Sequence, residues 1–357
     1  MHIAIIGAGV VGCALAHELS QNPKLSIFVL EKNQGIGEEV TSRNSGVIHS
    51  GLYYKPNSLK AKLCIEGQKL LYEWCTKKNV PHRKTGKLVV AHKNESDLLE
   101  NLRTQAIASG VSPENLKILN TKNLQKEYPY VQGESALCVA QSGIVDPHEL
   151  CRSFYVSAAH HGVEFIFLCE VKEIKQDGHY LIQTNRGELK ADVVINAAGL
   201  YADKVAHLAG INKYRIYPWR GDYFKIKLPY KVDKLIYPIK NPSDPGLGIH
   251  LTLNMQGGYF LGPDIEPASH ISDFAEKPEK LNAFFESSSQ LLKNIRRDML
   301  SYETCGIRPK LRAFDEKEEK DFVVSEDLPG FINLVGIESP GLTASMALAR
   351  YVKDVVK

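Results

Sequence analysis

Residues 2–12 read HIAIIGAGVVG and decide the fold. A short β-branched run leads into a glycine-rich turn, and residues 13–19 (CALAHEL) have helical character. A second apolar run at 25–30 ends in Glu31, which lies roughly 20 residues beyond Gly12. This order of strand, glycine turn, helix, strand and acid is typical of a domain that binds a dinucleotide.

The three glycines of the turn have separate expected roles. Gly7 permits the tight turn, Gly9 lets a phosphate approach bare backbone, and Gly12 allows the helix to pack closely on the strand. The amino end of the helix presents free amides and a positive dipole end to the pyrophosphate. Glu31 is expected to accept hydrogen bonds from ribose hydroxyls and to repel a 2′-phosphate, so NADP is disfavoured.

The sequence after Glu31 distinguishes FAD from a nicotinamide cofactor. It enters a polar, glycine-containing stretch at 35–46 instead of alternating strands and helices. Residues 171–190 read as short strands with turns, including the hairpin signal Asp-Gly at 177–178, and residues 191–199 read as a buried strand that leads into a glycine. A meander inserted before a late core strand is typical of FAD domains, and an unrelated second domain is the alternative.

The composition excludes several other classes of protein. The 357 residues carry a net charge of +3, with 43% hydrophobic and 24% charged residues, which rules out disorder, a collagen-like repeat and a coiled coil. No basic stripe points to nucleic acid, and seven scattered cysteines without C-x-x-C spacing argue against disulfides or a metal site. No apolar run approaches the roughly 18 residues of a membrane span. The first apolar run begins at Ile3, which leaves no room for a signal peptide, so we expect a cytoplasmic protein.

A set of motifs extends over nearly the whole chain. Residues 44–56 read NSGVIHSGLYYKP, and residues 58–64 read SLKAKLC. Shorter motifs are TGKL at 85–88, SGIVD at 142–146, AGLYAD at 198–203, RGDY at 220–223, LGPD at 261–264, GIRP at 306–309 and ESPGLT at 338–343. Together they resemble the L-2-hydroxyglutarate dehydrogenase/oxidase family, a branch of the FAD-dependent D-amino-acid-oxidase-like superfamily. The last two motifs belong to the superfamily generally.

The resemblance implies an α/β (α+β) fold, in which a Rossmann-like FAD-binding domain is interrupted by a substrate domain with a mixed or antiparallel sheet. The FAD domain would comprise residues 1–80, 145–215 and 325–357, and the substrate domain residues 81–144 and 216–324. Within the substrate domain, the spacing of apolar residues predicts a helix over 278–297.

The resemblance also assigns a set of residues to FAD, which we expect to be bound noncovalently. The final helix, over 340–356, would point its amino end at the flavin pyrimidine ring, where the dipole stabilises negative charge. Cys305 precedes GIRP, and a thioether from this cysteine to FAD is the less favoured alternative. Beyond the glycine turn and Glu31, the expected cofactor-binding residues are Arg43, Asn44, Ser45, Gly46, Val171, Ala198, Gly199, Gly341, Leu342 and Thr343.

Oxidation of an alcohol substrate requires a base. Oxidation of a 2-hydroxy acid moves a hydride from Cα to flavin N5 and removes a proton from a hydroxyl whose pKa lies far above neutrality. Histidine is the obvious proton acceptor near neutral pH. The candidates are His49, in the motif at 44–56, and His250, in an expected strand of the substrate domain. One of them would be the base and the other an orienting donor.

A dicarboxylate substrate also needs cationic partners. An arginine guanidinium binds a carboxylate through two hydrogen bonds and always stays charged. The resemblance assigns Arg308 to the C1 carboxylate, and Arg220 is the second expected anchor. Tyr53 and Tyr259 are expected to donate hydrogen bonds to substrate oxygens, with aromatic packing as the alternative role. We expect no metal ion in the site.

The leading hypothesis is the FAD-dependent oxidation of L-2-hydroxyglutarate to 2-oxoglutarate. The alternatives are an oxidase of the same fold that acts on another 2-hydroxy acid, glycine, a D-amino acid or glycerol 3-phosphate, and a flavin-binding scaffold without activity. The need for a base argues against the amine substrates. Oxygen, a quinone or an electron-transfer protein would reoxidise the flavin, and a quinone acceptor would require peripheral contact with a membrane.

Overall fold

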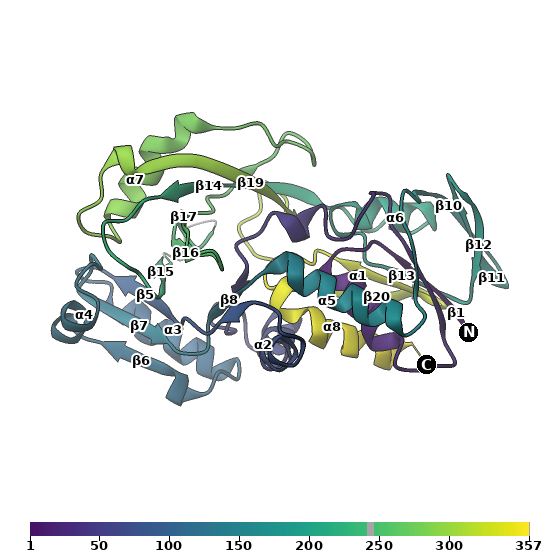
Figure 1. Ribbon diagram of the computed structural model, residues 1–357, viewed down its shortest axis with the longest axis horizontal. Coiled ribbons are helices and arrows are strands. Elements are labelled where there is room, and N and C mark those ends of the chain that lie inside the picture. Colours follow the sequence, from purple (N-terminus) through teal and green to yellow (C-terminus); the bar gives the residue numbers. More distant parts are fainter. Residues whose placement is uncertain (241–245, 357) are drawn as a thin grey trace.

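The computed structural model of the protein describes residues 1–240 and 246–356, and its two largest sheets lie side by side along the long axis (Figure 1). The first sheet contains, in spatial order, β20 (Val323–Leu328), β21 (Phe331–Val335), β13 (Val193–Asn196), β1 (His2–Ile6), β2 (Ser26–Leu30) and β9 (Glu164–Ile166). β1 lies between β2 and β13 and is parallel to both. The opening apolar run is therefore an inner strand in the parallel part of this sheet, whose edge strand β20 is antiparallel to β21, and the sheet is covered on both faces.

Helices cover one face of this sheet, and a β-meander covers the other. Ile3 and Ile5 of β1 pack with α1 (Val10–Leu19), α5 (Pro147–His160) and α8 (Gly341–Val355). Ala4 and Ile6 point the other way. They pack with α6 (Ala202–Leu208) and with the meander, which is formed by β10 (Val171–Asp177), β11 (His179–Thr184) and β12 (Gly187–Ala191). The predicted glycine turn and the predicted meander are both present.

The second sheet is mixed. Its strands, in spatial order, are β18 (Glu266–Pro267), β14 (Tyr217–Ile226), β17 (Tyr259–Leu261), β16 (Leu251–Leu253), β15 (Leu235–Pro238), β5 (Lys87–Ala91), β7 (Ser135–Val139) and β6 (Leu116–Leu119), with β19 (Leu300–Lys310) also paired to β14. Among the described residues β15 and β5 pair in parallel, whereas the long strands β14 and β19 are antiparallel. α3 (Ser96–Ala108) and α4 (Thr121–Glu127) flank its β5–β7–β6 part (Figure 1).

The two sheets take their strands from alternating parts of the chain. The first sheet uses strands within residues 2–30, 164–196 and 323–335, and the second uses strands within 87–139 and 217–310. The fold class is therefore confirmed, with a parallel Rossmann-like sheet and a mixed sheet in the part expected to bind substrate. The domain boundaries between these strands stay a prediction.

The helix expected over 278–297 is shorter than predicted. α7 spans Leu281–Ser289, and Asn294 beyond it has a left-handed φ of 56°. Leu292 lies in an isolated β-bridge with Val131 instead of in a helix, yet it is buried. The apolar spacing therefore identified core residues correctly and placed the end of the helix wrongly, because the segment after α7 packs into the same core.

A helix and a small sheet connect the two large sheets. α2 (Leu59–Lys78) packs against α8, and its first turn is capped by the Ser58 hydroxyl, which accepts a hydrogen bond from the Ala61 amide. The small sheet contains β3 (Val47–Ile48), β8 (Gly143–Val145) and β4 (His82–Arg83). Every helix within the described residues is too short or too polar to span a bilayer.

Candidate active site

A cavity of about 1280 Å³ extends from the glycine turn after β1 to the second sheet. Gly7, Gly9 and Glu31 line one end, and His250 and Arg308 line the other. An ordinary small-molecule pocket has a volume of roughly 300–1,000 Å³. The cavity is therefore large enough to hold a dinucleotide together with a small substrate.

The glycine turn has the geometry that its sequence predicts. Gly7 has a φ of 108°, and a Cβ atom there would lie 2.7 Å from the carbonyl oxygen of Ala197. A Cβ on Gly12 would lie 1.9 Å from the carbonyl oxygen of Gly7, so this glycine serves close packing and does not line the cavity. Gly9 does line it, and the nearest atom to a Cβ there is Thr41 Oγ1 at 3.4 Å. Bare backbone is thus available to a phosphate.

Glu31 is fixed at the cavity wall by two backbone amides. Its Oε2 accepts a hydrogen bond from the Ala8 amide at 2.7 Å, and its Oε1 accepts one from the Asn33 amide at 2.8 Å. A carboxylate has about four acceptor positions, so capacity remains for ribose hydroxyls. Val171, Ala198 and Gly199, which are also expected to bind the cofactor, line the cavity with Glu31.

The segment 43–46 lies where the two sheets meet. Arg43, Asn44 and Ser45 line the cavity, and the Ser45 hydroxyl is hydrogen-bonded to the Tyr223 hydroxyl at 2.9 Å. Gly46 does not line it. A Cβ on Gly46 would lie 2.6 Å from a backbone carbonyl oxygen, and its φ of 62° favours glycine. We therefore assign Gly46 a role in the turn instead of a contact with the cofactor.

The amino end of α8 faces the cavity. Gly341 and Leu342 line it, whereas Thr343 does not. The Thr343 hydroxyl accepts a hydrogen bond from the His49 amide at 3.0 Å and donates one to the Val47 carbonyl at 3.3 Å. Thr343 was expected to bind the cofactor; its hydroxyl instead holds the backbone of a candidate catalytic residue, because the first turn of α8 packs on β3.

Two histidines reach the cavity from different elements. His49 follows β3, and its Nε2 lies 3.1 Å from the Ser339 hydroxyl. His250 precedes β16, and its Nδ1 lies 2.7 Å from the carbonyl oxygen of Gly248. A carbonyl can only accept a hydrogen bond, so Nδ1 of His250 carries the proton. Nε2 of His250 therefore keeps its lone pair.

Both imidazoles are neutral at neutral pH. Burial is the main cause, and it lowers the pKa of His250 to about 3. The hydrogen bond to the Gly248 carbonyl raises this pKa, and the charges of Lys87 and Arg308 lower it further. Burial also lowers the pKa of His49 well below its usual value, and the charges of Lys87 and His250 act in the same direction. Neutral imidazole is the form that can accept a proton.

Arg308 presents a charge that has no carboxylate partner among the described residues. Its Nη1 donates to the carbonyl oxygen of Arg220 at 3.2 Å, and its Nη2 donates to the carbonyl oxygen of Asp264 at 3.0 Å. Among the described residues it forms no salt bridge, and it lines the cavity. A guanidinium has five donors, so Arg308 is oriented by backbone and retains donors for an anion.

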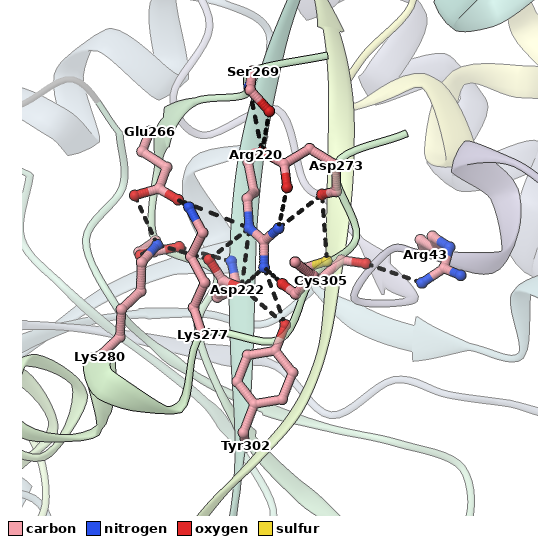
Figure 2. A network of polar contacts seen from close by, with 12 residues as sticks. Arg43, Arg220, Asp222, Glu266, Ser269, Asp273, Lys277, Lys280, Tyr302 and Cys305 are labelled. Carbon is pink, nitrogen blue, oxygen red and sulfur yellow. Dashed lines mark hydrogen bonds and ion pairs between the residues drawn. The ribbon is translucent and has the colours of Figure 1, made fainter. Parts of the chain in front are cut away.

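The expectation that Arg220 binds substrate is wrong. Its side chain is fully buried and does not line the cavity. Figure 2 shows its guanidinium within a network that includes Asp222, at 2.6 Å, and Asp273, at 3.1 Å. The reason is the alternation of side chains along β14. Gly221 and Tyr223 line the cavity, so the residues between and before them point to the opposite face.

The two tyrosines expected in the site have different surroundings. Tyr53 lines the cavity, and its buried hydroxyl has no hydrogen-bond partner among the described residues. Tyr259 does not line it; its hydroxyl accepts a hydrogen bond from the Val232 amide at 3.0 Å, and its ring packs in the core of the second sheet. The packing role is therefore the one that Tyr259 has. Tyr237, which sequence reasoning missed, lines the cavity and stacks on His250 at 3.8 Å.

A buried ion network beside α8 was also missed. Glu338 lies between Lys60, at 2.9 Å, and Lys310, at 2.9 Å, and all three line the cavity. Burial would raise the pKa of Glu338, but the two lysine charges outweigh it, and the pKa is lowered. The motif ESPGLT could have indicated this network. Its glutamate comes just before the helix that faces the cavity, and a buried carboxylate needs a cationic partner.

Cys305 lies on the side of the Arg220 network. Its Sγ is 4.0 Å from the carbonyl oxygen of Asp273, and the residue does not line the cavity, although the next residue, Gly306, does. The arrangement gives no support to a thioether from this cysteine.

The chain belongs to the DAO family of FAD dependent oxidoreductases, whose pattern it matches over residues 2–355. FAD is its cofactor, and the residues present fit FAD: Gly9 leaves bare backbone, Glu31 keeps acceptor capacity, and the amides of α8 face the cavity. The protein is thus an FAD-dependent oxidoreductase that acts on a small substrate.

The proteins similar to this chain are named for different substrates. A glycerol 3-phosphate dehydrogenase of Caloramator mitchellensis is 36% identical over 99% of this chain and 73% of its own length. L-2-hydroxyglutarate dehydrogenases of Pongo abelii (mitochondrial) and Indibacter alkaliphilus are each 33% identical, over 99% and 97% of this chain and 87% and 96% of their own lengths. The solved structure of L-alpha-glycerophosphate oxidase from Mycoplasma pneumoniae with FAD bound is 28% identical, with a TM-score of 0.91 over 99% of this chain and 94% of that one.

Proposed function

We propose that the protein oxidises L-2-hydroxyglutarate to 2-oxoglutarate. The observation that carries the proposal is that Arg308, a cation without a carboxylate partner among the described residues, lines the same cavity as two neutral histidines. Relatives named L-2-hydroxyglutarate dehydrogenase, at 33% identity over nearly the whole chain, support it. Bound FAD supplies the hydride acceptor.

The residues of the cavity have complementary roles in this reaction. The Arg308 guanidinium binds the C1 carboxylate and fixes the substrate by two parallel hydrogen bonds. Neutral His250, whose Nδ1 donates its proton to the Gly248 carbonyl, accepts the hydroxyl proton at Nε2, and His49 donates a hydrogen bond that orients the substrate oxygen. The buried Tyr53 hydroxyl, which has no hydrogen-bond partner in the part of the chain that the structure describes, donates to a substrate oxygen.

Anaerobic reduction of the purified yellow protein tests the proposal. L-2-hydroxyglutarate should bleach the flavin absorbance, and D-2-hydroxyglutarate and glycine should not. A flavin that stays oxidised with L-2-hydroxyglutarate would overturn the proposal. Replacing His49 or His250 with Asn should slow reduction by about 10²- to 10⁴-fold while changing substrate binding little, because general base catalysis contributes about that much. If both variants reduce at the normal rate, the histidines are not the base.

Glycerol 3-phosphate is the second candidate substrate. Two observations favour it: the 36% identity to a glycerol 3-phosphate dehydrogenase and the TM-score of 0.91 to a glycerophosphate oxidase. A phosphate group is recognised by arginine in the same way as a carboxylate, so Arg308 fits both compounds. The same anaerobic experiment separates them, because reduction by glycerol 3-phosphate and not by L-2-hydroxyglutarate would select this alternative.

A further inference from the structure

Lys87 is a buried lysine that the roles above do not use. It begins β5, within the motif TGKL, and only 1% of it is exposed. Among the described residues it forms no salt bridge, whereas the buried Lys60 and Lys310 both contact Glu338. Proteins almost never bury an ammonium group without a counter-charge. The position therefore requires an explanation.

Lys87 lies directly behind the wall of the cavity. Its Nζ is 3.8 Å from the ring centroid of Tyr237 and 5.4 Å from that of Tyr53. Both rings line the cavity, and Tyr237 also stacks on His250. An aromatic face attracts a cation but does not neutralise it. The positive charge of Lys87 therefore acts on the cavity through these two rings.

Lys87 is able to change its charge near neutral pH. Burial lowers its pKa to about 7, opposed by the nearby Cys64 thiol. The charged and titratable groups that face it come from α2, β15, the segment after β3 and the segment before β16. They are Cys64, Tyr237, Tyr53, His49 and His250. Burial raises the pKa of the Cys64 thiol to about 12, and it raises the pKa values of the tyrosines. Lys87 is thus the group among them that titrates near pH 7.

We propose that Lys87 is a specificity-determining residue that takes up a proton from solvent when a dianion enters the cavity. The inference rests on the proposed function and deepens it, because L-2-hydroxyglutarate carries two carboxylates. Arg308 supplies one positive charge, and protonated Lys87 supplies the second behind the Tyr53–Tyr237 wall. The two charges of the dianion are then balanced, whereas with a monoanion of the same shape Lys87 stays neutral and adds no attraction. Selection for dianions follows from this charge balance.

Binding of unreactive ligands to the oxidised holoenzyme tests this proposal without turnover. Glutarate is a dianion, and its monoamide is a monoanion of nearly the same shape. Titration calorimetry in two buffers of different ionisation enthalpy measures the protons taken up. Wild-type protein should bind glutarate with proton uptake above about pH 7, and it should bind the monoamide more weakly by roughly ten-fold or more with little uptake.

Three variants make the result specific to Lys87. Lys87→Met should lose roughly ten-fold or more in glutarate affinity and all proton uptake, with less than about two-fold change for the monoamide. Lys87→Arg should retain the preference for glutarate but lose the uptake, because arginine does not release its proton. Lys84→Met, an exposed lysine three residues earlier, is the matched control and should change neither quantity. Lys87→Gln replaces Lys87→Met if the latter fails to retain FAD.

The outcomes separate this proposal from the proposed function. If wild-type and Lys87→Met proteins take up the same number of protons with glutarate, or if wild-type protein does not bind glutarate, the role of Lys87 is wrong. Such a result leaves reduction of the flavin by L-2-hydroxyglutarate unaffected. If proton uptake depends on Lys87 but L-2-hydroxyglutarate does not reduce the flavin, the role of Lys87 stands and the substrate assignment falls.

Discussion

Arg220 and Lys87 are cations buried within the same sheet, but their surroundings differ. Arg220, in β14, contacts Asp222 and Asp273 and donates further hydrogen bonds to the carbonyl oxygen of Ala275 and the hydroxyl of Tyr302 (Figure 2). Lys87, in β5, has aromatic rings around its ammonium group and no carboxylate partner among the described residues. A cation whose partners belong to the protein stabilises the fold, and a cation without such partners is available to a ligand.

The Arg220 network also orients Arg308, which lies on the neighbouring strand β19 and contacts the backbone of β14. The carbonyl oxygen of Arg220 accepts a hydrogen bond from Arg308, as does that of Asp264. Asp264 in turn accepts hydrogen bonds from the Asp222 amide and from Lys280. The ion pairs of Arg220 therefore fix the backbone carbonyl that orients the Arg308 guanidinium. Arg220 is thus a positioning residue.

Breaking the Arg220 network should have the largest effect on stability. Arg220→Met leaves the fully buried carboxylate of Asp222 with fewer cationic partners, so we expect the free energy of unfolding to fall by about 3–5 kcal/mol. Urea unfolding of the holoenzyme measures the change. Arg296→Met, which removes an exposed ion pair with Asp298, is the control and should change the value by less than about 1 kcal/mol. Equal effects of the two substitutions would contradict the structural role of Arg220.

Removal of Arg308 should affect binding and leave the fold nearly intact. Because its partners are two carbonyl oxygens and a ligand, Arg308→Met should weaken glutarate binding by about 2–5 kcal/mol, the usual loss when one member of a buried charge pair is truncated. Calorimetric titration measures this loss. Arg308→Lys keeps the charge without the two-pronged geometry and should recover part of it. A Met variant that binds glutarate normally would remove Arg308 from the site.

Lys87→Met should change stability in the opposite direction from Arg220→Met. The pKa of Lys87 is lowered from 10.5 to about 7 in the folded state. At neutral pH the unfolded chain is therefore fully protonated at this lysine, whereas about half of the folded molecules have released the proton, which disfavours folding. Replacing the lysine should raise the free energy of unfolding by about 1–3 kcal/mol, given about 1.4 kcal/mol for each unit of pKa and some loss of contact with Tyr237.

The difference in unfolding free energy between wild type and Lys87→Met should depend on pH in a definite direction. Because the folded-state pKa of Lys87 is depressed, the wild-type protein gains stability relative to Lys87→Met as the pH rises from about 7 toward the unfolded value of 10.5. Urea unfolding of both proteins at about pH 7 and about pH 9 measures it. A Met variant that is less stable than wild type at both pH values would show that Lys87 is paired in the fold after all.

The sequence was informative where function depends on local order. The glycine turn, Glu31 and the meander at 171–191 form continuous segments, so their spacing alone predicts their geometry. His49, His250 and Arg308 line the cavity as expected because each lies in or beside a strand that borders it.

The sequence was less informative where function depends on strand direction and distant pairing. RGDY contains residues from both faces of β14, and the motif alone does not show which face borders the cavity. In the structure Gly221 lines the cavity and Arg220 does not. Lys87 meets Tyr237 because β5 and β15 pair in parallel, with Lys87 opposite Leu235. No local pattern in the chain predicts that pairing.

Tyr53→Phe tests whether a single buried hydroxyl stabilises the fold or serves as a contact for the ligand. The Tyr53 hydroxyl is a buried polar group at the cavity without a protein partner among the described residues. Removing it should therefore raise the free energy of unfolding of the ligand-free protein slightly, by about 0.5–1 kcal/mol, and should weaken substrate binding by a similar amount.

Tyr259→Phe is the matched control, because its hydroxyl accepts a hydrogen bond from the Val232 amide, and its loss should lower stability without changing substrate binding. Thermal unfolding and anaerobic titration measure both effects. If Tyr53→Phe is destabilising and binds substrate normally, the hydroxyl is a part of the fold and not a contact kept for the ligand.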